Sequence, residues 1–413
     1  MKALILSNAL DTNGQNTRYV RAAEKHGTAE SVLQVLAIGK YDPAGVVGRY
    51  VEAAERNPVA GLRIRSAQRD VYEIFDFPID LRWGRGAGRN DNLEVRRLAE
   101  EADLIHLNNS DAALAHMGLR LSKKPMLIHY HGSLFRMNPG KWLALARSKG
   151  WVQAVSTIDL QQPAPERLPW LPTAYDVGAL SEYAAANGRE PDGRVRIVHC
   201  PTGNVRDDPK HTELFVAAVQ SLIDDGLPID LVVVRNVSQA EVIRQKAQAD
   251  IVYDQLMYGY GCNSVEAWAM GKPVIAGADQ WTLRRMKDLW GALPFVVAQS
   301  SSLKGIIRKM VQSEQMRQDA AATGHAHVLR FHDELPALTI LAELYHDAIA
   351  LRNKPRIEGK GVQFRSARKK VMTYAGQPVD FREGVATVTD VEVVEKLRDT
   401  VKRRPRFGIE EVA

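Results

Sequence analysis

Short apolar runs alternate with amphipathic stretches along the first half of the chain. The runs have the composition of buried strands, and the predicted strands are Ala3–Ser7, Val32–Ile38, Val71–Ile74, Asp103–Leu107, Pro125–Tyr130 and Gln153–Val155. Stretches with helical spacing lie between them, including Thr17–His26, Asn92–Glu101 and Asp111–Leu121. Strands that alternate with helices predict a parallel sheet covered by helices. We therefore expect residues 1–172 to form one Rossmann-like domain.

The same alternation restarts after a proline-rich break at Pro163–Pro172, because proline removes backbone donors and ends regular structure. The second set of predicted strands is Val195–Cys200, Ile229–Arg235, Ile251–Tyr253, Val274–Ala276 and Phe295–Ala298. The predicted helices are His211–Asp224, Gln239–Ala249, Ser264–Met270, Leu303–Gln312 and a long closing helix, Leu335–Leu351. The expected fold class is α/β, with two Rossmann-like doubly wound domains, 1–172 and 195–351, that face a cleft. Residues 173–194 would cross between them.

The end of the chain has a different character. Residues 352–370 hold eight Lys and Arg against one Glu, a charge of +7, so the rest of the chain sums to −1 and the basic character belongs to this segment. We interpret it as a solvated basic linker rather than a DNA-binding surface, since Phe364 is its only aromatic residue. Two short strands, a helix from Asp390 and an edge strand predict a small α+β module over 371–413. A core of that size is marginal, so we expect the module to pack on a partner or to oligomerise.

Composition narrows the class of protein further. The chain has 413 residues, 45% apolar and 25% charged, which is ordinary for a globular protein. No apolar run is long enough to predict a membrane span, and the first apolar run is too short for a secretory signal. Cys200 and Cys262 are the only cysteines. We therefore expect neither a disulfide framework nor a structural zinc site, and a reducing, cytoplasmic location.

The stretch from Tyr253 to Ala276 has the strongest chemical signal. It reads as a strand end, a glycine loop, a helix and a second buried strand, with Asn263 or Ser264 as the helix cap. Glu266 falls in the first helical turn, where its carboxylate could accept both hydrogens of a vicinal diol such as a ribose. The structural alternative is that Glu266 only complements the helix dipole.

A pair of cations precedes another predicted helix in the same half. Arg206 and Lys210 follow the strand Val195–Cys200, so they and the free N–H groups of the helix would face one space. A diphosphate suits such a site, because Arg offers a planar fork and Lys a compact charge. The alternative is a pair of exposed cations on a loop.

These residues carry a resemblance. The run from Gly259-Tyr260-Gly261 through Glu266-Ala267-Trp268-Ala269-Met270-Gly271-Lys272-Pro273-Val274 resembles the signature of family 4 nucleotide-sugar glycosyltransferases. The resemblance extends over about residues 1–351 and implies the two-domain GT-B fold. It includes the loop from Asn8 to Gly14, the strand end His129-Tyr130-His131-Gly132 and the crossing Pro172-Thr173-Ala174-Tyr175-Asp176.

The resemblance also implies roles for single residues. Glu266 would hold the donor ribose, and Arg206 and Lys210 would hold the diphosphate and stabilise charge on the leaving group. Gly14 would let the first loop approach a substrate, and His131 would lie near the reacting sugar. The loop residues that would line the donor site are Tyr258, Gly259, Tyr260 and Gly261. The donor would be a nucleotide diphosphate-sugar, with no permanently bound cofactor and no metal.

One position departs from the family pattern. The family carries a second Glu eight positions before the first, and here that position is Tyr258. In the family this second Glu contacts the hydroxyls of the donor sugar, and Tyr258 offers no carboxylate for that contact. Asp254 lies nearby in sequence and is one candidate to replace it. His129 we interpret as a packing residue.

The last segment is similar to a small module of tailed-bacteriophage proteins, in the runs Val371-Met372-Thr373-Tyr374, Phe381 to Val388 and Arg406 to Val412. That resemblance implies a phage or prophage enzyme, in the host cytoplasm or associated with the virion.

The expected function is transfer of a sugar to an acceptor protein or glycan, with retention at the anomeric carbon. The expected partners of 371–413 are virion proteins or a second copy of the chain. Two alternatives stay open: a GT-B protein that has lost turnover and serves as a virion component, and a nucleotide-sugar epimerase.

Overall fold

The computed structural model describes residues 2–7, 22, 25, 31–36, 63–66, 69–73, 79–80, 99–108, 124–165, 168–201, 210–235, 237, 239–353, 362–366, 370–372, 378–380, 385–388, 391–403 and 409–412. The chain divides into two compact units, Met1–Ile349 and Ala350–Ala413. The first unit is built on two mainly parallel sheets, and the second unit is a small α+β module. Arg206, Gly14 and the predicted helix Asp111–Leu121 lie outside the described residues.

The first sheet has six strands, all parallel, in the order β5-β2-β1-β6-β7-β8. The strands are β1 (Lys2–Ser7), β2 (Ser31–Leu36), β5 (Ile79–Asp80), β6 (Leu104–Asn108), β7 (Met126–Tyr130) and β8 (Val152–Val155). The order reverses between β1 and β6, which is the doubly wound arrangement with its ligand crevice at the reversal. The predicted Rossmann-like fold class is thereby confirmed for this part of the chain.

Not every predicted strand joins this sheet. Val71–Ile74 corresponds to β4 (Arg69–Glu73), which pairs antiparallel with β3 (Arg63–Ser66) as a separate hairpin. After β7 the chain forms two helices that the sequence pattern does not predict, α5 (Gly132–Met137) and α6 (Pro139–Lys149). Asn138 caps α6 by accepting a hydrogen bond from the backbone N–H of Lys141. This helix buries little apolar surface beyond Trp142 and Ala146, so its periodicity is weak.

The second sheet has the order β10-β9-β11-β13, with β14 parallel and β12 antiparallel to β13. Its strands are β9 (Val195–His199), β10 (Ile229–Val233), β11 (Ile251–Tyr253), β12 (Tyr258–Gly259), β13 (Val274–Ala278) and β14 (Val296–Val297). Successive strand residues face opposite sides. Ile197 and Ile275 therefore join one apolar cluster, and Val198 and Val274 join the other. The strand order reverses between β9 and β11, which places a second ligand crevice there.

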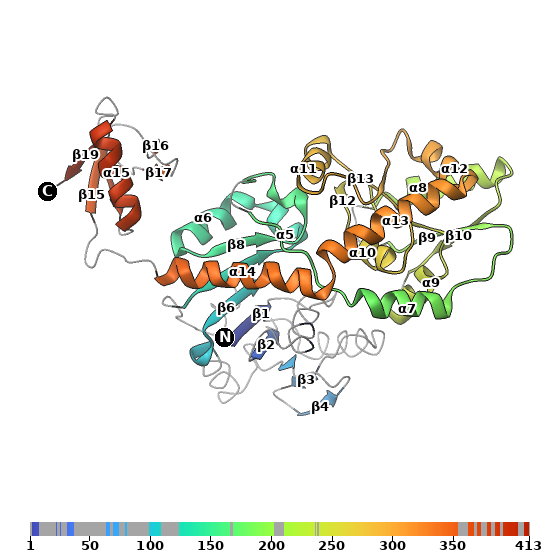
Figure 1. Ribbon diagram of the computed structural model, residues 1–413, viewed down its shortest axis with the longest axis horizontal. Coiled ribbons are helices and arrows are strands. Elements are labelled where there is room, and N and C mark those ends of the chain that lie inside the picture. Colours follow the sequence, from blue (N-terminus) through green and yellow to red (C-terminus); the bar gives the residue numbers. More distant parts are fainter. Residues whose placement is uncertain are drawn as a thin grey trace. The chain divides into compact units, whose positions relative to one another are not determined.

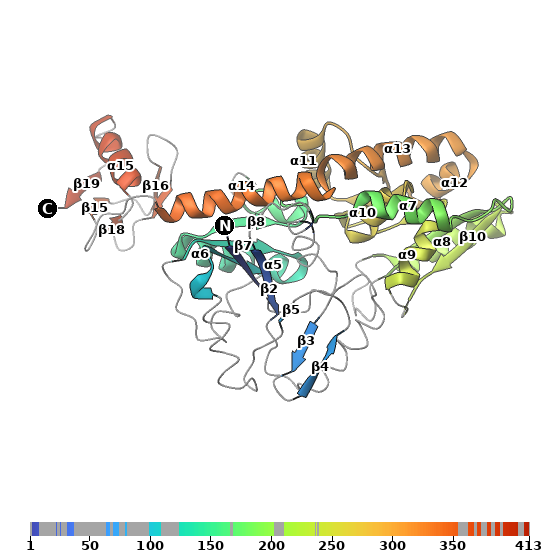
Figure 2. The same cartoon turned by 60° about the horizontal axis from the view of Figure 1, so that its bottom comes forward.

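Helices cover both faces of this sheet (Figures 1 and 2). On one face pack α8 (Thr212–Asp224) and α12 (Leu303–Gln312). The opposite cluster draws residues from α10 (Cys262–Ala269), α11 (Gln280–Trp290) and α13 (Glu314–Phe331), while α9 (Gln239–Ala247) and α7 (Val177–Asn187) pack together beside α10. The helices α7, α11 and α13 are absent from the sequence prediction; α7 occupies the segment that we expected to be a plain crossing.

The long helix α14 (Glu334–Asn353) is present where the sequence predicts Leu335–Leu351, but it covers a different domain. Its buried residues pack against strand residues of the first sheet, in a cluster with Leu104, Leu127 and Ala154. Figures 1 and 2 both show α14 lying along β8. The sequence assigns this helix to the second domain, and that assignment is wrong. Periodicity defines the apolar face of a helix but not the sheet that the face will cover.

The helices α10 and α13 approach each other closely because α13 has a glycine at the contact. A Cβ atom at Gly324 would lie 2.1 Å from Cδ1 of Trp268, whose side chain is fully buried. Neither backbone can shift freely, since Trp268 is also in edge contact with Tyr260 and His327. The absence of a side chain at Gly324 therefore sets the distance between these two helices.

We expect Gly324→Ala to lower the free energy of unfolding by about 1–3 kcal/mol, because overpacking displaces Trp268. Gly305→Ala in α12 is the matched control, since a Cβ there meets no atom within 4 Å. Alanine favours a helix over glycine by up to about 1 kcal/mol, so the control should be neutral or stabilising. Urea unfolding of both variants measures the difference. Equal effects would contradict the packing argument.

The second unit is built around a strand in the basic segment. The strand β15 (Val362–Ser366) lies between β18 (Val385–Val388) and β19 (Ile409–Val412), antiparallel to both. Residues 362–366 are therefore not a linker, and the prediction of a linker over 352–370 is wrong there. Phe364 is fully buried while Gln363 and Arg365 are exposed, an alternation that the abundance of charge concealed.

The core of the second unit combines Phe364 with Val394 and Leu397 of α15 (Val391–Arg403) and with Ile409. Arg398 on α15 binds Glu411 of β19 through two hydrogen bonds of 2.7 and 2.9 Å. A short antiparallel pair, β16 (Lys370–Met372) and β17 (Pro378–Asp380), adds Val379 to the core. Within the described part of the chain, no helix combines the length and the apolar character that a bilayer crossing needs.

Candidate functional site

A cluster of buried charges lies at the carboxyl ends of β9 and β11, where the order of the second sheet reverses. Cys200 follows β9, and Asp254 follows β11. Lys210 precedes α8, and Glu266 lies on α10. The open sheet brings all four chain segments to one edge, which is where doubly wound sheets bind ligands.

Asp254 organises this edge. Its Oδ1 accepts a hydrogen bond from Lys210 Nζ at 2.9 Å, and its Oδ2 accepts from Ser264 Oγ at 2.7 Å and from the backbone N–H of Gly261 at 2.9 Å. The side chain is 1% exposed. Burial alone would raise the pKa of Asp254, but the charge of Lys210 and these hydrogen bonds outweigh it and lower the pKa to about 2. Asp254 is therefore an anion that holds the glycine loop against Lys210.

Lys210 is fixed at both its backbone and its side chain. Tyr253 Oη donates to the carbonyl oxygen of Lys210 at 2.8 Å, and Lys210 Nζ donates to the carbonyl oxygen of Cys200 at 3.2 Å. The next residue, His211, has φ of 52°, in the left-handed region that few residues other than glycine adopt. Such a conformation stores strain and is common near functional sites.

Glu266 is paired with a lysine that is absent from the sequence prediction. Lys246 Nζ, on α9, lies 2.5 Å from Glu266 Oε2 and 2.7 Å from Asn263 Oδ1. The two charged residues are 0% and 2% exposed. Burial lowers the pKa of an amine, but the charge of Glu266 outweighs burial, so the pKa of Lys246 is raised. The side chain of Glu266 is thus held in one position by a buried cation.

The helix that carries Glu266 begins differently from the prediction. Its N-cap is Gly261, so Asn263 and Ser264 lie inside the first turn rather than at the cap. Asn263 instead joins Lys246 to the carbonyl oxygen of Cys200, to which its Nδ2 donates at 2.9 Å. Gly259 has φ of 84°, and a Cβ there would lie 2.4 Å from Met286. The positive φ favours glycine at 259, and the absence of a side chain there leaves room for the side chain of Met286.

The remaining predicted residues lie in three different places. Tyr260 is 5% exposed, and its hydroxyl contacts His327 and His332 in the core, so its side chain packs rather than facing the site. Tyr258 lines a pocket between the two domains. His131 lies in the first domain, at the end of β7, where it is the N-cap residue of α5.

His131 belongs to a group of three imidazoles. Its ring centroid lies 4.0 Å from that of His129, which lies 5.6 Å from that of His106. His131 Nε2 donates to Asn108 Oδ1 at 2.9 Å. Burial lowers the pKa of His131 to about 4 and that of His129 well below its ordinary value. Because a neutral imidazole has one N–H and Nε2 carries it here, Nδ1 of His131 can accept a hydrogen bond from a sugar hydroxyl. The low pKa makes His131 a weak base at neutral pH.

The imidazole group predicts an acid-sensitive fold. An unfolded histidine has a pKa near 6.5. Between about pH 6.5 and pH 4 the unfolded chain gains protons that buried His129 does not, so stability falls as the pH falls. In His129→Leu this loss should shrink by about 1.4 kcal/mol for each pH unit, the contribution of one proton. Urea unfolding from pH 7 to pH 4 tests this, with solvent-exposed His346→Leu as the control. Parallel pH profiles for His129→Leu and the wild type would contradict it.

Three neighbouring histidines are a pattern that can indicate a metal site. Among the described residues, however, no three His, Cys, Asp or Glu side chains are arranged to hold a metal ion.

The interdomain pocket has a volume of about 540 Å³ and draws its walls from both domains. The first domain contributes the end of α5 and the short helix η1 (Ile158–Gln161), and the second contributes residues 256–258 and 278–279. The guanidinium of Arg136 lies 3.9 Å from the ring centroid of Tyr258, and Arg136 Nε donates to Asp159 Oδ2 at 2.6 Å. The stack of Arg136 on Tyr258 thus joins the two walls, and the ion pair with Asp159 holds Arg136 within the first domain.

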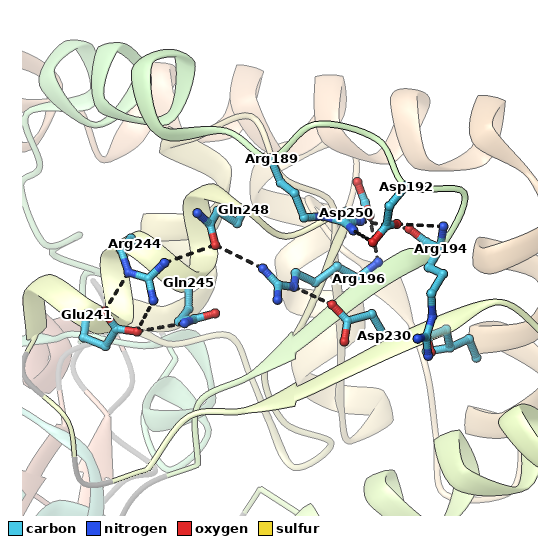
Figure 3. A network of polar contacts seen from close by, with 11 residues as sticks. Arg189, Asp192, Arg194, Arg196, Asp230, Glu241, Arg244, Gln245, Gln248 and Asp250 are labelled. Atoms are coloured by element: carbon cyan, nitrogen blue, oxygen red, sulfur yellow. Dashed lines mark hydrogen bonds and ion pairs between the residues drawn. The ribbon is translucent and has the colours of Figure 1, made fainter.

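A second polar network lies at the opposite edge of the second sheet (Figure 3). Asp250 Oδ2 accepts from the backbone N–H of Arg196 at 2.7 Å and from Arg189 Nη2 at 2.9 Å, and Arg196 Nε donates to Asp230 at 2.7 Å. These residues precede or begin β9, β10 and β11. Ligands bind at the carboxyl ends of such strands, so this network fastens the segment after α7 to the sheet.

Some of these residues had a signal in the sequence. Lys246 occupies a position of α9 whose helical neighbours Ile243 and Ala247 are buried, so a lysine on an apolar face could have indicated a buried ion pair. Arg136 and Asp159 had none, because a pocket between domains depends on how two separate sheets face each other.

The fold and the site together define a class. Two Rossmann-like domains in one unit, with a charged crevice at the reversal of the second sheet, constitute the GT-B fold. No model of a known protein family matches the chain, and no curated protein sequence matches it.

Solved structures of glycosyltransferases share the fold. The structure of HepE from Anabaena, in complex with UDP and glucose, is 15% identical with a TM-score of 0.55, over 84% of this chain and 100% of that one. A glycosyltransferase from Rickettsia africae is 12% identical with a TM-score of 0.52, over 84% and 98%. Sucrose-phosphate synthase from Thermosynechococcus elongatus is 14% identical with a TM-score of 0.50, over 85% and 99%. Likeness at these identities establishes the fold.

Proposed function

We propose that the protein is a glycosyltransferase that takes a sugar from a nucleotide diphosphate-sugar. The observation that carries the proposal is the cluster of Lys210, Asp254 and Glu266 at the reversal of the second sheet. Lys210 supplies a cation for the diphosphate, and the Glu266 carboxylate is held ready for a diol. HepE, which shares the fold, is solved with UDP-glucose as well as with UDP and glucose.

In this proposal the two ends of the donor meet different groups. The ribose hydroxyls donate to Glu266, whose second partner, Lys246, holds the carboxyl group in position. The diphosphate lies against Lys210, which stabilises negative charge as the bond to the sugar breaks. Arg206 and Gly14 remain proposed contacts to the diphosphate and to a substrate. Membership of family 4, retention at the anomeric carbon and a protein or glycan acceptor also remain proposals, supported by the sequence resemblance.

The test is binding and turnover with matched donors. Thermal-shift and calorimetric measurements with UDP, GDP, ADP and their sugar conjugates identify the base, since a ligand of the folded state raises the unfolding temperature. We expect Glu266→Gln to weaken binding of the preferred nucleotide, because a neutral amide accepts more weakly than a carboxylate. Failure of every nucleotide to bind would refute the proposal. Binding without release or transfer of sugar would favour the alternative of a binding component.

A further inference from the structure

Outside the nucleotide cluster of Lys210, Asp254 and Glu266, charged side chains also line the interdomain pocket. Its volume of about 540 Å³ is in the range of small-molecule sites. Its lining includes three charged side chains that could bind a polar ligand, namely Arg136, Asp159 and Asp279. Apolar walls with a few convergent polar groups are typical of pockets that orient a ligand.

The carboxylates of Asp159 and Asp279 differ in their capacity to accept a further hydrogen bond from a ligand. Both oxygens of Asp279 are used at the start of α11, where Oδ1 accepts from Thr282 N at 2.8 Å and Oδ2 from Thr282 Oγ1 at 3.1 Å. Asp159 Oδ2 is bound by Arg136, but the buried Asp159 Oδ1 has no hydrogen-bond partner. The side chain of Asp159 is 8% exposed. An acceptor buried without a donor is costly, and a ligand hydroxyl in the pocket would remove that cost.

The pocket adjoins the nucleotide cluster through the chain itself. Asp254 binds Lys210 with one oxygen and the backbone of Gly261 with the other, so residues 254–261 form a closed loop. This loop contributes Leu256, Met257 and Tyr258 to the wall that the second domain gives to the pocket. The loop that Asp254 fastens to Lys210 therefore also forms part of the wall of the pocket.

Two contacts keep Asp159 facing that wall. The Arg136 guanidinium stacks on Tyr258 and holds Asp159 Oδ2 at the same time. Two residues further along η1, Gln161 Oε1 accepts from Arg285 Nε of α11 at 3.0 Å. The position of Asp159 relative to the second domain is thus fixed from both sides.

We propose that Asp159 is a specificity-determining residue that accepts a hydrogen bond from a hydroxyl of the donor sugar bound in this pocket. The carboxylate that the sequence lacks at Tyr258 is then supplied by the opposite domain, with Arg136 as its positioning residue. This inference rests on the proposed function and names the part of the donor that the pocket takes.

The experiment compares a nucleotide with its sugar conjugate. Calorimetry with UDP and UDP-glucose, or with the GDP and GDP-mannose or ADP and ADP-glucose pair if the wild type prefers that base, gives the ratio of the two affinities. We expect Asp159→Asn to leave the affinity for the free nucleotide within about twofold and to weaken the conjugate about tenfold or more. Asp159→Glu keeps the charge but moves the oxygen. It should likewise weaken binding of the conjugate relative to binding of the free nucleotide.

Asp225→Asn is the control, because Asp225 is also paired with an arginine, Arg308, and is remote from the pocket lining. It should leave both affinities unchanged. Unchanged conjugate binding in both Asp159 variants, or equal weakening of nucleotide and conjugate, would overturn the assignment of Asp159 while the proposed function stands. A folded wild-type protein that binds no nucleotide would instead remove the proposed function, and this inference with it.

Discussion

Replacing Lys246 with methionine is expected to lower the free energy of unfolding by about 3–5 kcal/mol. The variant keeps the length of the side chain but removes the cation that Glu266 faces in a site that is 2% exposed. Removing one partner of a buried ion pair leaves the other charge uncompensated, which costs far more than the pair contributes. Urea unfolding measures the change. Arg244→Met, on the same helix, removes only a surface ion pair with Glu241 and should have a much smaller effect.

A double variant separates the structural role of this pair from its role in binding. Lys246→Met combined with Glu266→Gln has no buried charge at either position, so most of the lost stability should return. The proposed ribose contact is still absent, so nucleotide binding should stay weak in the refolded double variant. Wild-type stability in the single Lys246→Met variant would show that Glu266 does not depend on this cation.

The second large effect is expected from Lys210→Met. Sugar release from the preferred donor should slow by about 10²–10³-fold, because a fixed cation at a developing diphosphate stabilises the transition state more than the ground state. Lys210→Arg keeps the charge and should retain more activity. Initial rates of donor hydrolysis, measured at saturating donor, test this. A rate equal to that of the wild type, with only a weaker affinity, would place Lys210 in ground-state binding alone.

Lys210→Met should also change how the free energy of unfolding depends on pH, through its effect on Asp254. The pKa of Asp254 is about 2 when Lys210 is present, below the ordinary value of about 4 for an unfolded aspartate. A carboxylate with a lowered pKa contributes stability above the unfolded value and loses it as the pH falls through the folded one. Without Lys210, burial raises the pKa of Asp254 and this contribution disappears. Lys210→Met combined with Asp254→Asn should remove the difference from the pH profile.

The local pattern of the chain predicted most of the strands. Ile251–Tyr253 is recovered with the same bounds, and α12 with Leu303–Gln312. Both have an apolar pattern that repeats with the period of the element, so local sequence is sufficient. The predictions failed where charge or small residues concealed that pattern. Val362–Ser366 is a central strand inside a basic segment, and α7 is an alanine-rich helix inside an expected connection.

The candidate site divides in the same way. The sequence indicated Glu266 and Lys210, because each stands beside a predicted helix start at a strand end. Lys246 and Asp254, which hold those two side chains in place, are 20 and 44 residues away from them. Their partnership depends on which helices and strands become neighbours. The sequence therefore indicated the strand and helix ends where Glu266 and Lys210 lie. Tertiary packing determined that Lys246 pairs with Glu266 and Asp254 with Lys210.

By itself the sequence determined the α/β class, the two-domain arrangement and the strand ends at which chemistry could lie, because apolar periodicity and glycine positions act over a few residues. Only the tertiary structure decided that α14 covers the first sheet, that Lys246 neutralises Glu266, and that Arg136 and Asp159 meet Tyr258 across a pocket. Each of these depends on the contact of two surfaces far apart in the chain. Complementary shape and burial select such contacts, and neither is written in a local pattern.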